Sequence, residues 1–407
     1  MQFVIFTLNM NASFEIQFLI HASNPFPEKV SKELLLELLP KIERWDWLCE
    51  SASRNSVSPL IYYNLQRTGL LNELQPKYKE ILEKHYRNAG IRNLKLRSAF
   101  IEIARQLLSQ GINIIALKGI ALQHELYYNP ALRPMIDIDI LVKEDQAEKA
   151  LQVIYNIGGE AITYSESKYI DKFKHHYPPI FYKGVAIEIH RALFDSYDTV
   201  QIPVNSIWEK AEMRQIEGLN VLVPEKHHQL LFLCHHVFST LRGGTVKLIW
   251  YIDISAFLQK NFTAIYWDRF KKLVDETNAN DSVFHSLGIV SYLFKEHFFE
   301  DTIKYEINKY CPRPQEILFY IENAIVSPEL NHYYQKFCNI NSLTGKLKYL
   351  KNRMFPSVDF IQKKYQTSGF ISILESYQKE FFSFISLGFR ILLSKLILII
   401  KHTKRKE

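Results

Sequence analysis

Residues 132–142 read LRPMIDIDILV, and within this stretch Asp137 and Asp139 alternate with isoleucines. Such alternation is typical of a β-strand, in which successive side chains point to opposite faces, so both carboxylates share one face. Two like charges at this spacing repel each other and raise each other's pKa unless a cation joins them. The stretch therefore predicts a strand whose acidic face meets a metal ion, a basic partner or solvent.

The segments on both sides of this stretch alternate between strand and helix patterns. Residues 112–119, INIIALKG, form a short β-branched run, and residues 185–193, VAIEIHRAL, alternate again like a strand. Residues 120–128 and 143–158 carry the spacing of apolar residues that is typical of helices. This succession predicts an α/β unit. Residues 218–225, GLNVLVPE, are expected to add an edge strand or one arm of a hairpin.

Helical patterns dominate outside this unit. From Ser31 to Gln110 apolar residues recur at three- and four-residue spacing, and the same period returns after Pro224. The predicted class is therefore α+β, an α/β core with a small mixed sheet flanked by N- and C-terminal helical regions. The expected parts are a mostly helical region at 1–110, the core at 111–225, a helical region at 226–380 and an amphipathic, basic tail at 381–407.

The composition is that of a folded chain in a reducing compartment. The 407 residues are 47% hydrophobic and 23% charged, which is typical of globular proteins and excludes a largely disordered chain. The four cysteines include no CxxC pair, which argues against a zinc knuckle or a disulfide framework. Residues 1–27 lack the features of a signal peptide and are expected to form a first strand or helix that packs on the body. These features favour a cytoplasmic protein.

Positive charge is concentrated at the end of the chain. The net charge is +7, but residues 390–407 hold six basic residues against one acid and account for +5, which leaves +2 elsewhere. The apolar stretch at 381–400 is interrupted by Arg390 and Lys395, which disfavours a membrane-spanning helix. Two alternatives stay open for 381–407: a peripheral contact with an anionic membrane surface, or a terminal helix that packs on the body.

Charged residues of the α/β unit form one constellation. Lys118-Gly119 ends an expected strand and opens a helix, where free backbone N–H groups and a lysine can hold phosphate oxygens. Asp137 and Asp139 project from one face of the next strand, and Glu188 projects with His190 from one face of a later strand. Three carboxylates that converge from neighbouring strands are what two magnesium ions need to bridge a triphosphate and an attacking hydroxyl.

These residues, in this order, resemble a known family. The succession LKG, helix, DIDILV, HHYPPI and AIEIH is similar to the polymerase-beta-type nucleotidyltransferase superfamily, and most of all to its bacterial branch of uncharacterised nucleotidyltransferase family proteins. The resemblance covers roughly residues 110–260. It implies a magnesium-dependent enzyme that transfers a nucleoside monophosphate from an NTP such as ATP to a hydroxyl and releases pyrophosphate.

The resemblance also implies roles for individual residues. Asp137 and Asp139 match the metal-binding, catalytic pair, and Glu188 matches the third carboxylate, as a metal ligand or a general base. Lys118-Gly119 stands where the superfamily has Gly-Ser, so phosphate contacts from Lys118 and the Gly119 N–H are inferred. Arg133 either reaches the triphosphate or pairs with a nearby carboxylate.

Several histidines lie near this constellation, each with two interpretations. His190 is either a buried hydrogen-bonding group or a participant in catalysis. His176 either borders the pocket or anchors its loop. His235 and His236 either face the cleft or satisfy buried polar groups.

The acceptor of the nucleotide is open at this point. A sugar, an antibiotic, a peptide, a protein side chain or an RNA end would need the same chemistry. The nearly balanced charge outside the tail favours a small molecule, a peptide or a protein over RNA. The departures from Gly-Ser and from a third aspartate leave an alternative, a catalytically inactive protein of the same fold that binds a nucleotide or a partner. A third reading places the function in the tail, at a membrane surface or in an assembly.

Overall fold

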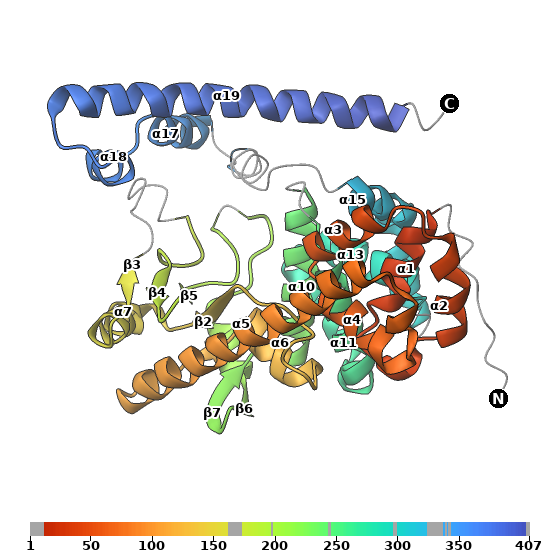
Figure 1. Ribbon diagram of the computed structural model, residues 1–407. Helices are drawn as coiled ribbons and strands as arrows, with labels where there is room; N and C mark the ends of the chain where they lie inside the picture. The colour runs from red at the N-terminus through yellow and green to blue at the C-terminus, as the bar shows by residue number, and fades with distance from the viewer. Residues whose placement is uncertain are drawn as a thin grey trace.

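A mixed β-sheet and a body of helices lie side by side, and the long helix α5 (Pro76–Ser109) runs from the helical body along the sheet (Figure 1). The computed structural model describes residues 12–161, 173–196, 198–242, 246–295, 299–323, 337, 340 and 343–403. Of the expected N-terminal element, residues 1–11 lie outside this part, and Phe14–Ala22 form helix α1.

Seven strands form one sheet in the order β3-β4-β5-β2-β1-β7-β6. Their bounds are β1 Ile115–Ala116, β2 Asp137–Leu141, β3 Glu160–Ala161, β4 Ile180–Tyr182, β5 Val185–His190, β6 Glu212–Ile216 and β7 Leu219–Val223. β2 lies in the middle, parallel to β5 on one side and antiparallel to β1 on the other. The expected strands with the acidic residues therefore lie next to each other.

Two tight hairpins complete the sheet. Lys183 and Gly184 join β4 to β5 with φ +48° and +80°, and Glu217 and Gly218 join β6 to β7 with φ +52° and +77°. Left-handed values at both central positions are those of a type I′ turn, whose twist matches that of the flanking strands. β7 is the expected hairpin arm, and because β1 pairs with its other side, β6 is the edge strand at this end of the sheet. The short strands β3, β4 and β6 were not expected.

Helices precede and follow the sheet along the chain. Those before it are α1, α2 (Lys32–Leu38), α3 (Trp45–Arg54), α4 (Ser58–Thr68) and α5, with 3-10 turns at Pro27–Lys29, Leu39–Lys41 and Leu70–Glu73. Ser31 caps α2, because its side-chain oxygen accepts a hydrogen bond from the Leu34 N–H at 3.1 Å. Within the sheet region lie α6 (Lys118–Leu126), α7 (Ala147–Asn156), α9 (Val204–Lys210) and a 3-10 turn at Glu144–Gln146.

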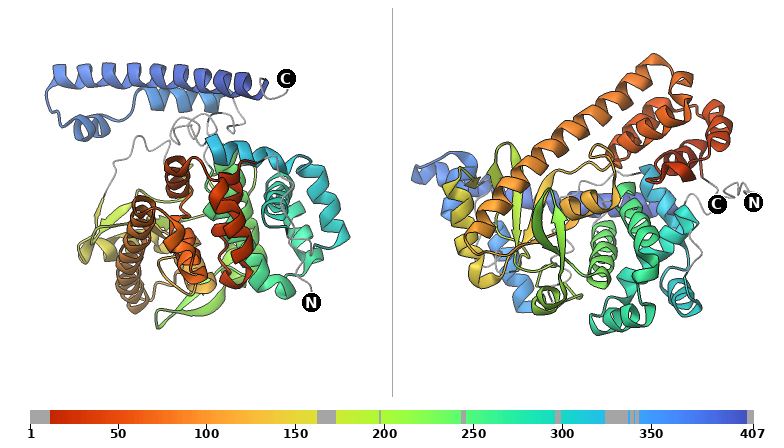
Figure 2. Two further views of the ribbon diagram at one scale, coloured as in Figure 1. Left: turned by 45° about the vertical axis from the view of Figure 1, so that its right-hand side comes forward. Right: turned by 90° about the horizontal axis from the view of Figure 1, so that it is seen from below.

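The helices after the sheet pack together with those before it. They are α10 (Lys226–Arg242), α11 (Leu248–Asn261), α12 (Trp267–Glu276), α13 (Asn280–Phe294), α14 (Asp301–Tyr310) and α15 (Ile317–Asn323), with 3-10 turns at Phe262–Ala264 and Pro314–Glu316. One hydrophobic cluster contains Phe18 and Leu60 from the first group and Phe257 and Phe284 from the second. A second cluster is formed by residues of the sheet, α5 and α7. Figure 2 shows the long helix α5 lying along the sheet. The α+β class with flanking helical regions is confirmed, while the exact region boundaries stay a prediction.

The C-terminal helices pack on one another along one side of the molecule (Figure 1). These are α17 (Leu343–Met354), α18 (Val358–Tyr365) and α19 (Phe370–Thr403). Lys364 Nζ of α18 lies 2.7 Å from Glu380 Oε2 of α19. No helix among the described residues is long and apolar enough to cross a membrane. Residues 404–407 of the expected basic tail lie outside the described part, and a contact of this region with a membrane surface stays a prediction.

Candidate active site

Carboxylates meet on one face of the sheet. The parallel register of β2 and β5 places Asp139 directly opposite Glu188. Asp137 shares the face of Asp139, and His190 that of Glu188, because residues two apart on a strand point the same way. Asp139, Glu188 and His190 each offer one atom that could bind a metal ion, and these atoms lie within 4.8 Å of one another. The tertiary structure thus brings together the acidic residues that the sequence placed on separate strands.

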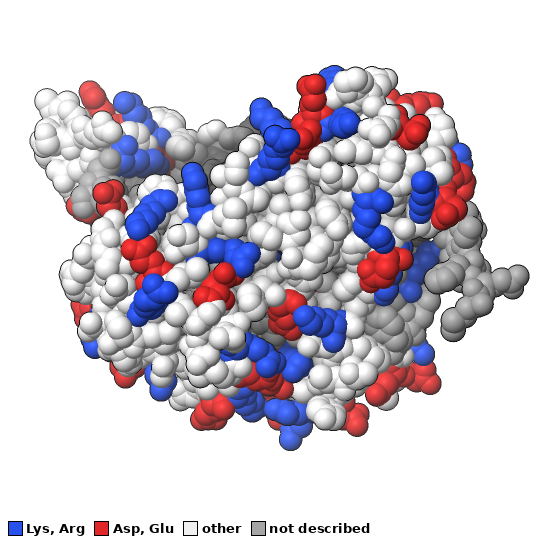
Figure 3. Space-filling view, turned by 60° about the horizontal axis from the view of Figure 1, so that its bottom comes forward, with Lys and Arg blue, Asp and Glu red and all other residues white. Residues whose placement is uncertain are grey.

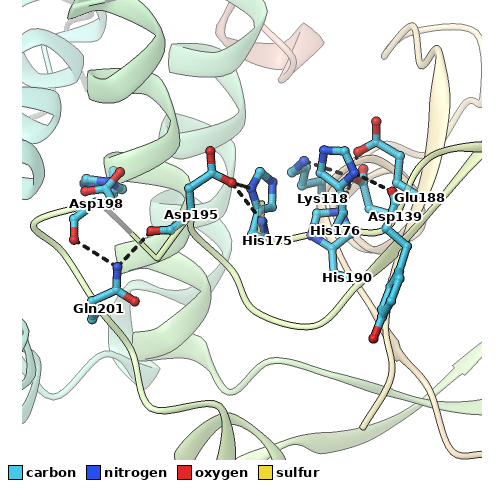
Figure 4. A network of polar contacts seen from close by, with 11 residues as sticks. Lys118, Asp139, His175, His176, Glu188, His190, Asp195, Asp198 and Gln201 are labelled. Atoms are coloured by element: carbon cyan, nitrogen blue, oxygen red, sulfur yellow. Dashed lines mark hydrogen bonds and ion pairs between the residues drawn. The ribbon is translucent and has the colours of Figure 1, made fainter. Parts of the chain in front are cut away.

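Lys118 brings a cation to this cluster. As the first residue of α6 it has φ +41°, a left-handed conformation that costs a non-glycine residue on the order of 1 kcal/mol. Its Nζ lies 2.9 Å from Asp139 Oδ1 (Figure 4). Burial by itself would lower the pKa of Lys118, but the charges of Asp139, Glu188 and Asp137 raise it above its usual value. Lys118 therefore stays protonated and neutralises Asp139.

His190 donates a second hydrogen bond to the same oxygen. Its Nε2 lies 2.8 Å from Asp139 Oδ1 and 3.7 Å from Glu188 Oε2. The ring is buried, which disfavours the charged form, yet the hydrogen bond to Asp139 and the nearby carboxylate of Glu188 raise its pKa above the usual value. Its Nδ1 has no partner among the described polar atoms. The placement matches the buried hydrogen-bonding interpretation, and the bond fixes the orientation of the Asp139 carboxylate.

The two aspartates of β2 have opposite electrostatic environments. Burial would raise the pKa of Asp139, but Lys118 and His190 hold it well below its usual range. Asp137 forms no hydrogen bond or ion pair with a residue that the structure describes, and burial together with Asp139 raises its pKa to about 7. Asp137 is therefore the carboxylate whose negative charge is least compensated.

The segment that precedes β4 brings His176 to the cluster. Its backbone bridges to His190, and the Tyr177 N–H donates to the Ile189 carbonyl at 2.8 Å. The ring centroids of His176 and His190 lie 5.7 Å apart. His176 Nδ1 donates to the Tyr177 carbonyl at 2.7 Å, so a neutral ring has an unprotonated Nε2, and burial lowers the pKa. His176 is thus held beside Glu188 in a form that can accept a proton.

A chain of polar contacts anchors this segment to the loop that follows β5. The His175 backbone N–H donates to Asp195 Oδ1 at 2.8 Å, and the His175 ring contacts the same carboxylate (Figure 4). Gln201 Nε2 in turn donates to the carbonyls of Asp195 and Asp198, each at 2.9 Å. These bonds fix the loop that positions His176.

Arg133 pairs with a carboxylate that is distant in the sequence. Its Nη2 lies 2.8 Å from Asp253 Oδ2, and its Nε lies 3.0 Å from Asp253 Oδ1, with both side chains buried. Tyr127 Oη donates to the same carboxylate at 2.7 Å. Of the two interpretations of Arg133, pairing with a carboxylate is therefore present in the structure. A contact with triphosphate stays a prediction, since Arg133 also lines the adjoining cavity.

Helix α5 holds the loop that carries Arg133. Asn93 Nδ2 donates to the Arg133 carbonyl at 2.7 Å, and Asn93 Oδ1 accepts from the Met135 N–H at 3.1 Å. Gly119 is pressed against this loop, because a Cβ there would lie 2.9 Å from Met135 Sδ and 3.0 Å from Arg133 Nη1. The glycine is thus required for packing, and a contact of its N–H with phosphate stays a prediction.

A cavity of about 530 Å³ adjoins the two aspartates. The sheet region contributes Lys118, Asp137 and Asp139 to its lining, and both helical regions contribute the rest. From α5 come His85 and Arg92, and from α10, α11 and the link between them come His236, Lys247 and Trp250. The cavity is therefore enclosed by the sheet region and by the helical regions before and after it. No local pattern in the sequence indicated this.

Two cations in this lining were not expected from the sequence. Neither Arg92 nor Lys247 forms an ion pair with a carboxylate in the part of the chain that the structure describes. Lys247 Nζ lies 5.4 Å from the Trp250 ring centroid, and burial lowers its pKa. A half-buried ammonium that makes no ion pair favours an anionic ligand. For Lys247, the only local signal in the sequence was the polar stretch that precedes the apolar helix α11.

His235 and His236 have different surroundings. His236 lines the cavity, packs edge-on against Trp250 and has its pKa lowered to about 3 by burial, so it is neutral. His235 faces away from the cavity, with its Nε2 3.0 Å from Asp198 Oδ2. One histidine of the pair thus faces the cleft and the other satisfies a polar group elsewhere.

The donor set fits a divalent cation. Carboxylate oxygens are the ligands that magnesium prefers, and Asp137, Asp139 and Glu188 present them from two adjoining strands. The raised pKa of Asp137 reflects negative charge that a bound cation would neutralise. These residues fit magnesium. His190 lies close enough to Asp139 and Glu188 to be a further metal ligand.

The fold fits a nucleotidyl-transferring enzyme, and comparison with known families supplies this class. The profile of a family described as uncharacterised nucleotidyltransferase matches residues 42–295. The protein belongs to this family and is a transferase of nucleotidyl groups. The match is wider than the resemblance noted from the sequence, because it includes the helical walls of the cavity. No curated protein matches the chain.

Proposed function

We propose that the protein is a magnesium-dependent enzyme that transfers a nucleoside monophosphate from an NTP to a hydroxyl of a small molecule, a peptide or a protein, with release of pyrophosphate. The observation that carries this proposal is the meeting of Asp137, Asp139 and Glu188 on one face of two adjoining strands, beside a cavity of about 530 Å³. Family membership supplies the reaction class, and the site suggests how it is performed.

The acidic residues have distinct parts in this proposal. Asp137, Asp139 and Glu188 hold two magnesium ions, which when bound neutralise charge at the α-phosphate and align the acceptor hydroxyl. Glu188 is a ligand or takes the proton of the attacking hydroxyl. His176, whose Nε2 is unprotonated beside Glu188, is the other candidate for that proton.

Basic side chains along the cavity wall bind the polyphosphate of the NTP in this proposal. Lys247 and Arg92 line the cavity without an ion pair to a described carboxylate, so anionic phosphate oxygens are suitable partners. Lys118, Arg133 and the Gly119 N–H remain candidate nucleotide contacts at the sheet side. The Trp250 face next to Lys247 offers an apolar surface for a base.

The acceptor is proposed to be small or a peptide or protein group rather than RNA. On the face seen in Figure 3, basic and acidic side chains are interspersed and form no continuous basic stripe. RNA ends are normally held by an extended positive surface. An acceptor that enters the enclosed cavity needs no such surface.

Pyrophosphate release tests the proposal. Wild type is incubated with each NTP and magnesium, in buffer and in cell extract, and compared with Asp137→Ala/Asp139→Ala. We expect release in extract to fall by on the order of 1000-fold in the double variant, because charge stabilisation of the transition state is lost. A control variant, Asp145→Ala/Glu148→Ala, removes two exposed acids of the same region and should release pyrophosphate like wild type.

The same assay distinguishes the inactive alternative. The pairing of Lys118 with Asp139 favours that alternative to some degree, since it already neutralises one expected metal ligand. Nucleotide binding without any release above the double variant, in every extract and with every NTP, would establish a binding protein in place of an enzyme.

A further inference from the structure

One oxygen of the Asp139 carboxylate is occupied by groups of the protein itself. Oδ1 receives Lys118 Nζ at 2.9 Å and His190 Nε2 at 2.8 Å, and the side chain is 1% exposed. Asp139 lines the cavity together with Lys118. A metal ion that binds Asp139 from the cavity therefore comes close to the Lys118 ammonium.

Lys118 and a divalent cation compete for one place. Both are positive, and two cations that contact the same carboxylate repel each other strongly in a buried site. The cluster holds three carboxylates, Asp137, Asp139 and Glu188, and Lys118 is the lysine that contacts it. The lysine charge therefore weakens the binding of a divalent ion at Asp139, and its move to another anion removes this repulsion.

The position of Lys118 permits this exchange. Its side chain is 21% exposed and lines the cavity, whereas the Asp139 side chain is 1% exposed. A lysine carries a compact charge on a flexible four-carbon stem, so a single contact can be exchanged without movement of the backbone. Lys118, whose φ is +41°, lies at the boundary between Asp139 and the cavity.

We propose that Lys118 is a placeholder cation, which neutralises Asp139 in the empty site and transfers its contact to the polyphosphate when nucleotide and divalent cation bind together. This inference rests on the proposed function. Metal alone binds weakly, because it must displace Lys118 into solvent without a new partner. Nucleotide provides that partner, so each ligand strengthens the binding of the other, as linkage requires.

The experiment measures Mn²⁺ affinity by electron paramagnetic resonance, with and without an NTP analogue that has a methylene bridge between its α- and β-phosphorus atoms. We expect wild type to bind Mn²⁺ at least about tenfold more tightly with the analogue. Lys118→Met should bind Mn²⁺ alone about tenfold more tightly than wild type, with a much smaller effect of the analogue. Lys118→Arg, which keeps the charge, should retain weak binding of Mn²⁺ alone.

A matched control and a folding check accompany these variants. Lys95→Met removes an exposed lysine of α5 that does not line the cavity, and its Mn²⁺ affinities should equal those of wild type. Circular dichroism spectra verify that each variant is folded, and Lys118→Gln replaces Lys118→Met if the latter is not.

Two negative results have different meanings. Equal Mn²⁺ affinity in wild type and in the folded uncharged variant overturns the placeholder role and leaves the proposed function intact. Absence of Mn²⁺ binding in every variant, with the analogue present, overturns the metal-dependent function and the placeholder role with it.

Discussion

Two buried ion pairs border the same cavity and differ in how firmly they are made. Arg133 and Asp253 are joined by hydrogen bonds from two guanidinium nitrogens, and Tyr127 adds a third donor. Lys118 reaches Asp139 through one ammonium contact and is partly exposed. A planar guanidinium holds a carboxylate in a fixed geometry, whereas an ammonium is an exchangeable point charge. The first pair joins the sheet region to α11, and the second is suited to change partners.

Removal of Asp253 should have the largest effect on stability. Asp253→Ala leaves Arg133 buried without a counter-charge, and loss of one partner of a buried pair typically destabilises by about 3 to 5 kcal/mol. The measurement is the free energy of unfolding in urea. The double variant Arg133→Met/Asp253→Leu should recover much of this loss, because no charge remains buried. A loss below about 1 kcal/mol in Asp253→Ala would show that the pair does not hold the two regions together.

Replacement of the two aspartates of β2 should change stability in opposite directions. Asp139→Asn removes the counter-charge of Lys118 and should lower the free energy of unfolding by about 2 kcal/mol at pH 8. Asp137→Asn removes an uncompensated charge and should raise it by about 2 kcal/mol at the same pH. Equal signs for the two variants would contradict the difference in their environments.

The effect of Asp137→Asn should depend on pH in a defined direction. The pKa of Asp137 rises to about 7 on folding, so its ionised form destabilises the native state. This loss is absent below the ordinary value near 3.8, grows as the pH rises, and is complete above about 7. The difference between wild type and variant should therefore be small at pH 4 and full at pH 8. Urea unfolding at a series of pH values measures it.

The smallest effect is expected at the helical wall of the cavity. Lys247→Ala should weaken binding of the NTP analogue about tenfold, or about 1.4 kcal/mol, since one charge-assisted contact with phosphate is lost. Lys95→Ala should leave the affinity unchanged, because Lys95 lies outside the cavity. Titration calorimetry at two salt concentrations would show whether the contact is electrostatic. An unchanged affinity in Lys247→Ala would exclude this lysine from the nucleotide site.

Local patterns in the sequence were sufficient to predict the strands that carry the acidic residues and the shared face of each pair of polar residues. Alternation along residues 136–142 put Asp137 and Asp139 on one face, and a second alternating run did the same for Glu188 and His190. This works because the side-chain period of a strand depends only on the backbone of that strand. β3 and β4 escaped detection because two and three residues carry too little pattern, and β6 because its residues, EMRQI, are mostly polar and do not alternate.

The partners of these residues were decided by tertiary structure. Asp253 follows Arg133 by 120 residues, and only the packing of α11 beside the loop brings their charges together. The same holds for Arg92 and Lys247, which reach one cavity from opposite ends of the family match. The sequence by itself determined which carboxylates face the same way, since that is a local property of the chain. Which of them is neutralised by a lysine, and which is left uncompensated, depends on contacts between distant segments and on burial, and these exist only in the folded protein.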